Sequence, residues 1–247
     1  MSGHNKWSTI KHKKAAADAK RGKAFTRIAK EITIAAREGG GDPDGNPRLR
    51  SAVAAAKSAN MPNDNVKRAI QRGTGEIPGV SYEEISYEGY GPGGVAILID
   101  CLTDNKNRTT PEIRHLFSKA GGNLGEPGSV AWMFDRKGIL VVPTSAAGED
   151  RLMEIVLEAG ADDLEESDDG FVVQCSVEAF PAVQAALEEA GIEPGEAKLV
   201  MEPQNLLMLD GEKAAQCLRL LELFEDHDDV QNVWANLDFD ESQVPSD

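Results

Sequence analysis

The sequence predicts an α+β protein with an N-terminal three-helix domain and two α/β domains, the third of which is ferredoxin-like (βαββαβ) and inserted in the second. Three observations support this prediction. Apolar residues follow a helical period up to about residue 75, strands and helices alternate after residue 76, and residues 137–203 contain a complete βαββαβ order. A chain of 247 residues with 40% hydrophobic residues can bury the cores of two or three domains.

A first helix is expected from Ala15 to about Arg37. At about 100° per residue, one side of this helix is apolar and the nearly opposite side is basic. The basic stripe consists of Lys20, Lys23, Arg27, Lys30 and Arg37. These cations either contact phosphates or form an ordinary solvated helix face. In both cases, replacing the first four with Gln, a good helix former, is expected to change stability little.

Two further helices complete the first domain, residues 1–75. Asn46-Pro47 supplies a cap and a first turn for the second helix. Asn60-Met61-Pro62 interrupts the helical pattern, and Asn63 or Asp64 is expected to cap the third helix. The outer side of the third helix carries Lys67, Arg68 and Arg72.

The second domain is expected to combine residues 76–136 with residues 204–247. Val95–Cys101 is a continuous apolar run and predicts a buried strand, and Thr110-Pro111 is expected to begin a helix. Val130–Phe134 predicts another short strand. A C-terminal helix and a strand at Val230–Leu237 are too short to form a domain alone, so they are assigned to this one.

The inserted third domain spans residues 137–203. Its order of strand, helix, two strands, helix and strand is the split βαβ plan. The expected elements are a strand at Ile139–Val142, a helix at 149–160, strands near Asp162–Glu166 and Phe171–Cys175, a helix from Phe180 to Ala190, and a strand at Ala197–Met201.

The net charge of −16 is distributed very unevenly. Residues 1–75 hold 16 Lys and Arg against 6 Asp and Glu, a net charge of +10. Residues 76–247 hold 10 against 36, a net charge of −26. A basic N-terminal domain on an acidic body indicates that one end of the chain contacts nucleic acid.

Several classes of protein are excluded or disfavoured. No apolar run is long enough for a membrane span, and the N-terminal residues do not form a secretory signal. Three widely spaced cysteines disfavour a disulfide scaffold or a zinc ribbon, so the cytosol is the expected compartment. Asp42–Asn46 copies the start of an EF-hand loop, but Pro47 and Val53 stand where Gly and Glu are needed. No catalytic, cofactor or metal motif is present, which argues against an enzyme and predicts no cofactor.

Two polar segments are candidates for recognition. The N-terminal arm carries Lys6, Trp7, Lys11, His12, Lys13 and Lys14. Its Trp7 can stack on an unpaired base or can fold back onto the helices as a hydrophobic plug. Thr103–Thr109 follows a strand and precedes a helix, and capping of that helix is preferred over ligand recognition.

The longest distinctive segments are GHNKWSTIKHKKAAADAKRGKAFTRIAKEITIAAREGGGDPDGNPRLR, NMPNDNVKRAI, YEGYGPGGVA, TDNKNRT and PGSVAW. Together they resemble the YebC family, which includes the mitochondrial translational activator of cytochrome c oxidase. The resemblance covers essentially the whole chain and implies a helical domain, two α/β domains and a non-enzymatic role in gene expression. Bacterial members are described as DNA-binding transcriptional regulators. Other members act in translation, at ribosomes that stall on sequences such as proline runs.

A nucleic-acid-binding regulator is therefore the leading functional hypothesis, with DNA or ribosomal RNA as the partner. A helix-turn-helix is disfavoured because the joint Ser58–Asn63 contains a proline. An acidic body is repelled by long DNA but can meet basic ribosomal proteins on the ribosome. The alternative is an acidic protein-interaction adaptor without direct nucleic-acid binding. The chain is expected to act as a monomer in the cytoplasm.

Overall fold

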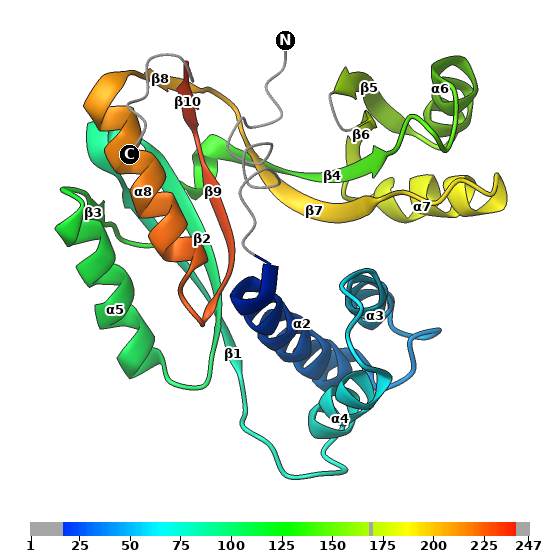
Figure 1. Cartoon of the computed structure of the whole chain (residues 1–247), viewed down its shortest axis with the longest axis horizontal. Coiled ribbons are helices and arrows are strands. Elements are labelled where there is room, and N and C mark those ends of the chain that lie inside the picture. Colours follow the sequence, from blue (N-terminus) through cyan, green and yellow to red (C-terminus); the bar gives the residue numbers. More distant parts are fainter. Residues whose placement is uncertain (1–16, 168–169, 241–247) are drawn as a thin grey trace. The chain divides into compact units, whose positions relative to one another are not determined.

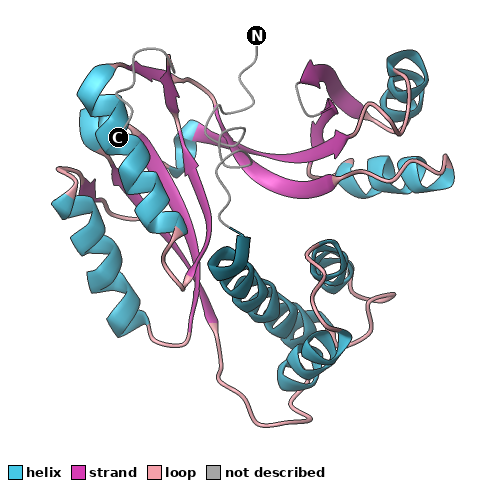
Figure 2. Ribbon diagram, viewed as in Figure 1, coloured by secondary structure: helices cyan, strands magenta, loops and turns pink. Residues whose placement is uncertain are grey.

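A computed structural model describes residues 17–167 and 170–240 of the chain, with side chains from residue 22 onward. These residues form α-helices and mainly antiparallel sheets, which confirms the predicted α+β class (Figures 1 and 2). They divide into two compact units, one with residues up to 131 and from 206 onward, the other with residues 132–205. Within the described ranges, no helix is both long and apolar enough to cross a membrane.

The first unit begins with three helices, α2 (Ala17–Gly39), α3 (Pro47–Ser58) and α4 (Asn63–Gly73). The Asn46 side chain accepts a hydrogen bond from the Leu49 amide at 3.1 Å, so α3 begins where the sequence predicts. The apolar faces of the three helices form one small core. Its buried members are Ile32, Ala35, Ala36, Leu49, Ala52, Ala56, Met61 and Ala69.

The end of α4 lies directly against α2. A Cβ at Gly73 would lie 2.4 Å from the Thr33 carbonyl oxygen, so only glycine fits there. Thr33 Oγ1 also donates a hydrogen bond to the Ala69 carbonyl at 3.2 Å. These contacts hold one face of α4 on α2 and turn the opposite face outward.

The connection between α3 and α4 is only four residues long, Ala59–Pro62. The Asn60 amide donates to the Lys57 carbonyl at 2.9 Å, and the Met61 amide donates to the Ala56 carbonyl at 2.8 Å. This is a Schellman motif, with Asn60 in the left-handed region at φ 56°. The helix α4 then begins directly after Pro62 and has no side-chain cap, which contradicts the expected cap at Asn63 or Asp64.

The rest of the first unit is a four-stranded antiparallel sheet in the order β3-β1-β2-β9. Helices α5 (Lys106–Lys119) and α8 (Gly211–Glu225) pack together on it, and the rings of Phe117 and Phe224 have centroids 4.7 Å apart (Figure 1). The strands are β1 (Glu83–Tyr90), β2 (Ala96–Thr103), β3 (Asn123–Leu124) and β9 (Val230–Ala235), and a separate parallel pair is β8 (Leu207–Leu209) with β10 (Leu237–Phe239).

The second unit has the βαββαβ order that the sequence predicts. Its antiparallel sheet has the order β5-β6-β4-β7, and α6 and α7 share its apolar core. The elements are β4 (Phe134–Val142), α6 (Glu149–Glu158), β5 (Ala161–Ser167), β6 (Gly170–Ser176), α7 (Phe180–Glu189) and β7 (Glu196–Pro203). The expected division into three domains, 1–75, 76–136 with 204–247, and 137–203, stays a prediction.

Three expected element boundaries are wrong. Helix α5 begins at Lys106 and not at Thr110-Pro111, because the Asn105 side chain accepts a hydrogen bond from the Arg108 amide and starts the helix earlier. The expected strand Val130–Phe134 is largely the 3₁₀ helix η2 (Ala131–Met133). The expected strand Val230–Leu237 is divided at Asn236, whose side-chain oxygen accepts a hydrogen bond from the Ala96 amide.

The left-handed conformation of Asn60 gives a first testable prediction. Asn60→Ala should lower the free energy of unfolding by about 1 kcal/mol, because the short polar side chain of asparagine tolerates the left-handed region by hydrogen-bonding locally and alanine has no such group. Asn60→Gly should be neutral or slightly stabilising. Urea unfolding of both variants checks this, and an equal effect of Ala and Gly would contradict the role assigned to Asn60.

Candidate nucleic-acid interface

Three cations of the basic stripe lie against an acidic segment of the same chain, residues 225–229, which runs from the last residue of α8 to the start of β9. Lys23 Nζ lies 3.0 Å from Asp226 Oδ1 and donates to the Asp226 carbonyl at the same distance. Arg27 donates to the Glu225 carbonyl. Lys30 continues this row toward the interior of the unit.

Lys30 is buried, with 7% of its surface exposed. Its ammonium group donates to Asp229 Oδ1 at 2.8 Å, to the Asp228 carbonyl at 2.9 Å and to the Leu102 carbonyl at 3.2 Å. These three acceptors match the three donors of a lysine. Lys30 therefore joins α2 both to the end of β2 and to the segment that leads into β9.

Asp229 is the centre of this network. Besides Lys30, its Oδ2 accepts hydrogen bonds from Arg108 Nη2 at 2.6 Å, Thr109 Oγ1 at 2.8 Å and Thr103 Oγ1 at 3.2 Å. Burial alone would raise the pKa of this carboxyl, but the hydrogen bonds from Lys30, Arg108 and Thr109 hold the pKa well below its usual range. Asp229 is therefore ionised at neutral pH.

A second ionic cluster surrounds Arg48. Its guanidinium lies 2.7 Å from Glu31 Oε1 and 2.8 Å from Glu38 Oε2, and it also pairs with Glu84 on β1. Glu84 makes this cluster another link between the helices and the larger sheet. Glu31 and Glu38 both form ion pairs with Arg48, and neither forms one with the basic residues of α4.

The basic residues on the outer face of α4 have a different environment. Lys67, Arg68 and Arg72 are exposed, and within the described ranges none has an acidic partner. Arg68 is held by Asn65 Oδ1 at 2.6 Å and by the Asp64 carbonyl at 3.2 Å, both on α4 itself. These three cations are available to an external anion.

The remaining predicted contacts fall into two groups. Arg37 is exposed and donates to Ser81 Oγ at 2.8 Å. The side chain of Lys20 lies outside the described side chains, and the arm residues lie outside the described residues: Lys6, Trp7, Lys11, His12, Lys13 and Lys14. Their contact with nucleic acid stays a prediction.

The burial of Lys30 changes one expectation from the sequence. A lysine that is bound on three sides inside the unit cannot reach a phosphate in this conformation. Replacing Lys30 with Gln would also remove one of the two cations that bind Asp229. The four Gln substitutions in the stripe should therefore lower stability, which contradicts the expectation from the sequence.

The structure also shows residues that the sequence interpretation missed. Asp229 is one of 36 acidic residues after position 75 and has no local signal that separates it from the others. Arg108 lies in the segment Thr103–Thr109, whose preferred interpretation, helix capping, is confirmed by Asn105. The sequence analysis did not predict that Thr103, Arg108 and Thr109 of this segment donate hydrogen bonds to Asp229.

A cleft of about 1310 Å³ lies between α2 and α5 within the first unit. Lys23 and Arg27 line it from α2, and Arg108 and His115 line it from α5. Its other side is formed by the acidic segment around Asp228 and Asp229. The cleft thus has basic residues on two helices and acidic residues between them.

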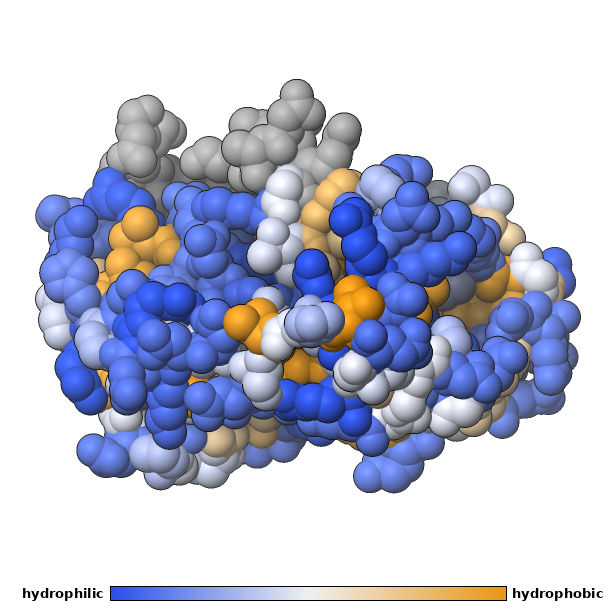
Figure 3. Space-filling view, turned by 90° about the horizontal axis from the view of Figure 1, so that it is seen from below, coloured by the Kyte–Doolittle hydropathy of each residue, from blue (hydrophilic) through white to orange (hydrophobic). Residues whose placement is uncertain are grey.

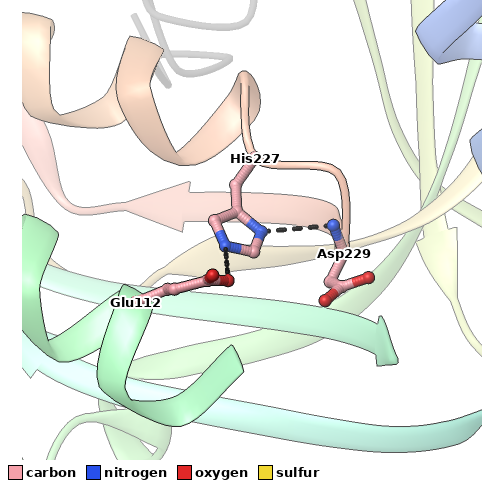
Figure 4. Close-up of side chains that lie close together, drawn as sticks. All are labelled: Glu112, His227 and Asp229. Atoms are coloured by element: carbon pink, nitrogen blue, oxygen red, sulfur yellow. Dashed lines mark hydrogen bonds and ion pairs between the residues drawn. The ribbon is translucent and has the colours of Figure 1, made fainter. Parts of the chain in front are cut away.

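Glu112, His227 and Asp229 lie close enough together in this cleft to suggest a metal site (Figure 4). His227 Nδ1 accepts a hydrogen bond from the Asp229 amide at 3.2 Å, so the ring proton is on Nε2, which faces Glu112 at 3.0 Å. A metal ion on Nε2 would need the opposite tautomer, and both Asp229 oxygens already accept hydrogen bonds. These residues therefore fit an internal hydrogen-bond network better than a metal site.

Among the residues that the structure describes, the exposed large hydrophobic side chains are scattered along the sequence. They are Val80, Trp132, Met153, Leu157, Leu206, Met208 and Leu223, which come from several elements of the two units. The face of the molecule in Figure 3 is mostly hydrophilic, with small groups of hydrophobic residues. Charged and polar groups therefore dominate this face.

The chain matches two family models. Residues 5–76 match the model described as the TACO1/YebC protein N-terminal domain. Residues 82–237 match the model described as the TACO1/YebC second and third domain.

Similar proteins extend over the whole chain. A protein of Koribacter versatilis named as a probable transcriptional regulatory protein is 61% identical over 244 residues, 99% of this chain and 98% of that protein. One of the same description from Desulfatibacillum aliphaticivorans is 59% identical over 247 residues, 100% of both chains. The crystal structure of a conserved hypothetical protein from Aquifex aeolicus is similar with a TM-score of 0.84 and 42% identity, covering 92% of this chain and 95% of that chain.

The two ion pairs of the stripe should differ strongly in their effect on stability. Asp229→Asn should lower the free energy of unfolding by about 3 kcal/mol, because Lys30 would remain buried without its counter-charge. Asp226→Asn should cost less than about 1 kcal/mol, since the side chains of Lys23 and Asp226 are 42% and 66% exposed. Urea unfolding at pH 7 measures both, and equal losses would show that Asp229 is not the centre of the network.

Proposed function

This chain belongs to the TACO1/YebC family, and we propose that it is a non-enzymatic, cytoplasmic regulator of gene expression that binds nucleic acid through its three helices. The names of relatives with about 60% identity, which describe probable transcriptional regulatory proteins, support a regulatory role. The net charge of +10 on residues 1–75 supports a polyanionic ligand.

The observation that carries this proposal is the outer face of α4. Gly73 and Ala69 hold the inner face of the helix on α2, so Lys67, Arg68 and Arg72 face away from the core. The basic stripe on α2 is largely bound to the acidic segment 225–229, whereas these three cations are not paired with acidic residues in the described part of the chain. Phosphates of a nucleic acid are the ligands that such a face attracts.

The short connection between α3 and α4 favours a duplex as the ligand. A helix-turn-helix uses a turn of three or four residues, and its second helix enters the major groove. In the sequence, Pro62 disfavours such a turn. In the structure, however, Asn60 adopts the left-handed conformation that a compact turn requires. We therefore assign α4 as the helix that approaches the nucleic acid.

The second unit supports a further partner. Residues 132–205 contain 17 Asp and Glu but only 4 Lys and Arg. Such a unit is repelled by phosphates and attracted by basic proteins, including those of the ribosome. An RNA target on a ribosome would therefore accommodate both the basic helices and the acidic second unit, and RNA and DNA must be tested side by side.

Replacing Lys67, Arg68 and Arg72 with Gln should weaken binding without unfolding the helix. Affinity decreases as salt increases, so the slope of log affinity against log salt is negative. If all three cations contact phosphates, the magnitude of this slope should decrease by about 2.7 for duplex DNA and by about 2 for single-stranded RNA. Fluorescence anisotropy with a labelled 30-base-pair duplex and a 30-nucleotide RNA, at several KCl concentrations, measures both slopes.

A matched control removes three cations elsewhere, with Arg151→Gln, Lys198→Gln and Lys213→Gln in one chain. It has the same net charge as the α4 variant, so only local contacts distinguish the two. If both variants bind with the wild-type slope, α4 is not the contact surface. If wild-type protein binds neither probe, the proposed function is wrong and the adaptor without nucleic-acid binding replaces it.

A further inference from the structure

The acidic segment 225–229 binds the two ends of the α2 stripe in different ways. Lys23, Arg27 and Lys30 are spaced by four and three residues, so their side chains lie on one side of the helix. The segment has four carboxylates in five residues, and it contacts each of the three cations. Lys23 is exposed, Arg27 is half-buried and Lys30 is buried, so burial increases along the contact.

The inner end of this contact is fixed. The side chains of Lys30 and Asp229 are 9% and 3% exposed, and all three donors of Lys30 have acceptors. Separating this pair would leave Lys30 buried without its counter-charge, which is strongly unfavourable. A phosphate therefore cannot replace Asp229 at Lys30.

The outer end of the contact can open at little cost. Lys23 is bound by the carboxylate and by the carbonyl oxygen of Asp226, but both side chains are largely exposed. Exposed ion pairs contribute little to stability and are screened by salt, so the fold does not depend on this pair. However, Asp226 belongs to the same compact unit, and its effective concentration at Lys23 is therefore far higher than that of a dissolved phosphate. Lys23 is accessible to solvent but already occupied.

Arg27 lies among the same negative charges. Its guanidinium donates to the Glu225 carbonyl. Burial lowers the pKa of Arg27, and the charges of Glu225, Asp226 and Asp228 oppose this lowering. Asp226 and Asp228 also line the cleft together with Arg27. A phosphate that enters the cleft therefore meets these carboxylates when it approaches the cation.

Contacts other than those with α2 hold the acidic segment in place. His227 Nε2 lies 3.0 Å from Glu112 Oε2, and His227 Nδ1 accepts a hydrogen bond from the Asp229 amide (Figure 4). The Asp226 amide donates to the Glu222 carbonyl at 2.8 Å, which continues the hydrogen bonding of α8 to the start of the segment. The carboxylates are therefore placed beside the stripe without any contribution from its cations.

We propose that Asp226 closes a latent phosphate-binding position at Lys23, so that the acidic segment competes with the nucleic acid for the outer end of the basic stripe. This proposal rests on the proposed function and adds a regulation to it. The cations of α4 are available to a phosphate at all times, whereas Lys23 becomes available only where Asp226 is displaced or neutralised. The segment thereby lowers the affinity of the helices for nucleic acids in general and limits non-specific binding.

The test is the full-length variant Asp226→Asn, because a neutral amide holds an ammonium group less strongly than a carboxylate does. Release of Lys23 to one phosphate should strengthen binding at about 0.1 M KCl by about fivefold on the single-stranded RNA and by about eightfold on the DNA duplex. The magnitude of the slope of log affinity against log salt should increase by about 0.7 on RNA and by about 0.9 on the duplex. A second variant, with Lys23→Gln added to Asp226→Asn, should lose this gain.

The matched control is Glu158→Gln, which removes one exposed carboxylate from the last turn of α6 and gives the same net charge as Asp226→Asn. Circular dichroism melting confirms that each variant is folded. A gain in Asp226→Asn that the control lacks and that Lys23→Gln abolishes supports the proposal. If wild-type protein binds and Asp226→Asn binds like the control, or keeps its gain when Lys23 is replaced, the competition is refuted and the proposed function stands. If neither wild type nor Asp226→Asn binds a probe, both proposals fall together.

Discussion

The buried ion pair between Lys30 and Asp229 is the interaction on which the arrangement of the first unit depends. It joins α2 to a segment 199 residues further along the chain. A buried charge is costly unless its hydrogen bonds are satisfied, and here Lys30 has three acceptors while Asp229 accepts from Lys30, Arg108 and two threonines. The network therefore requires the three helices and the larger sheet to be docked in one geometry.

This docking divides the basic residues into two classes. Lys23, Arg27 and Lys30 are bound by carboxylates and a carbonyl oxygen of the acidic segment 225–229, which take the place that phosphates of a nucleic acid could take. The cations on the outer face of α4, Lys67, Arg68 and Arg72, have no such partner among the described residues. The chain's own carboxylates thus determine which of its basic surfaces remain available to a nucleic acid.

The sequence predicts those features that have local causes. The cap at Asn46, the βαββαβ order and the apolar faces of the helices all follow from residues within a few positions of each other. The amphipathic period of α2 shows that Lys30 lies on a polar face, but it cannot tell whether water, a phosphate or Asp229 covers that face. Similarly, the proline in the α3–α4 joint obscured the turn that Asn60 makes possible.

A double-mutant cycle between Lys30 and Asp229 tests this account most directly. The free energy of unfolding is measured for wild type, Lys30→Met, Asp229→Leu and the double variant, and the coupling energy is the part of the two losses that is not additive. The account predicts a coupling of about 2–3 kcal/mol. Asp229→Leu leaves Lys30 buried without a counter-charge and Lys30→Met leaves Asp229 with Arg108 as its one cation, whereas the double variant contains neither of the two buried charges. A coupling close to zero would contradict it, because the two side chains would then contribute independently.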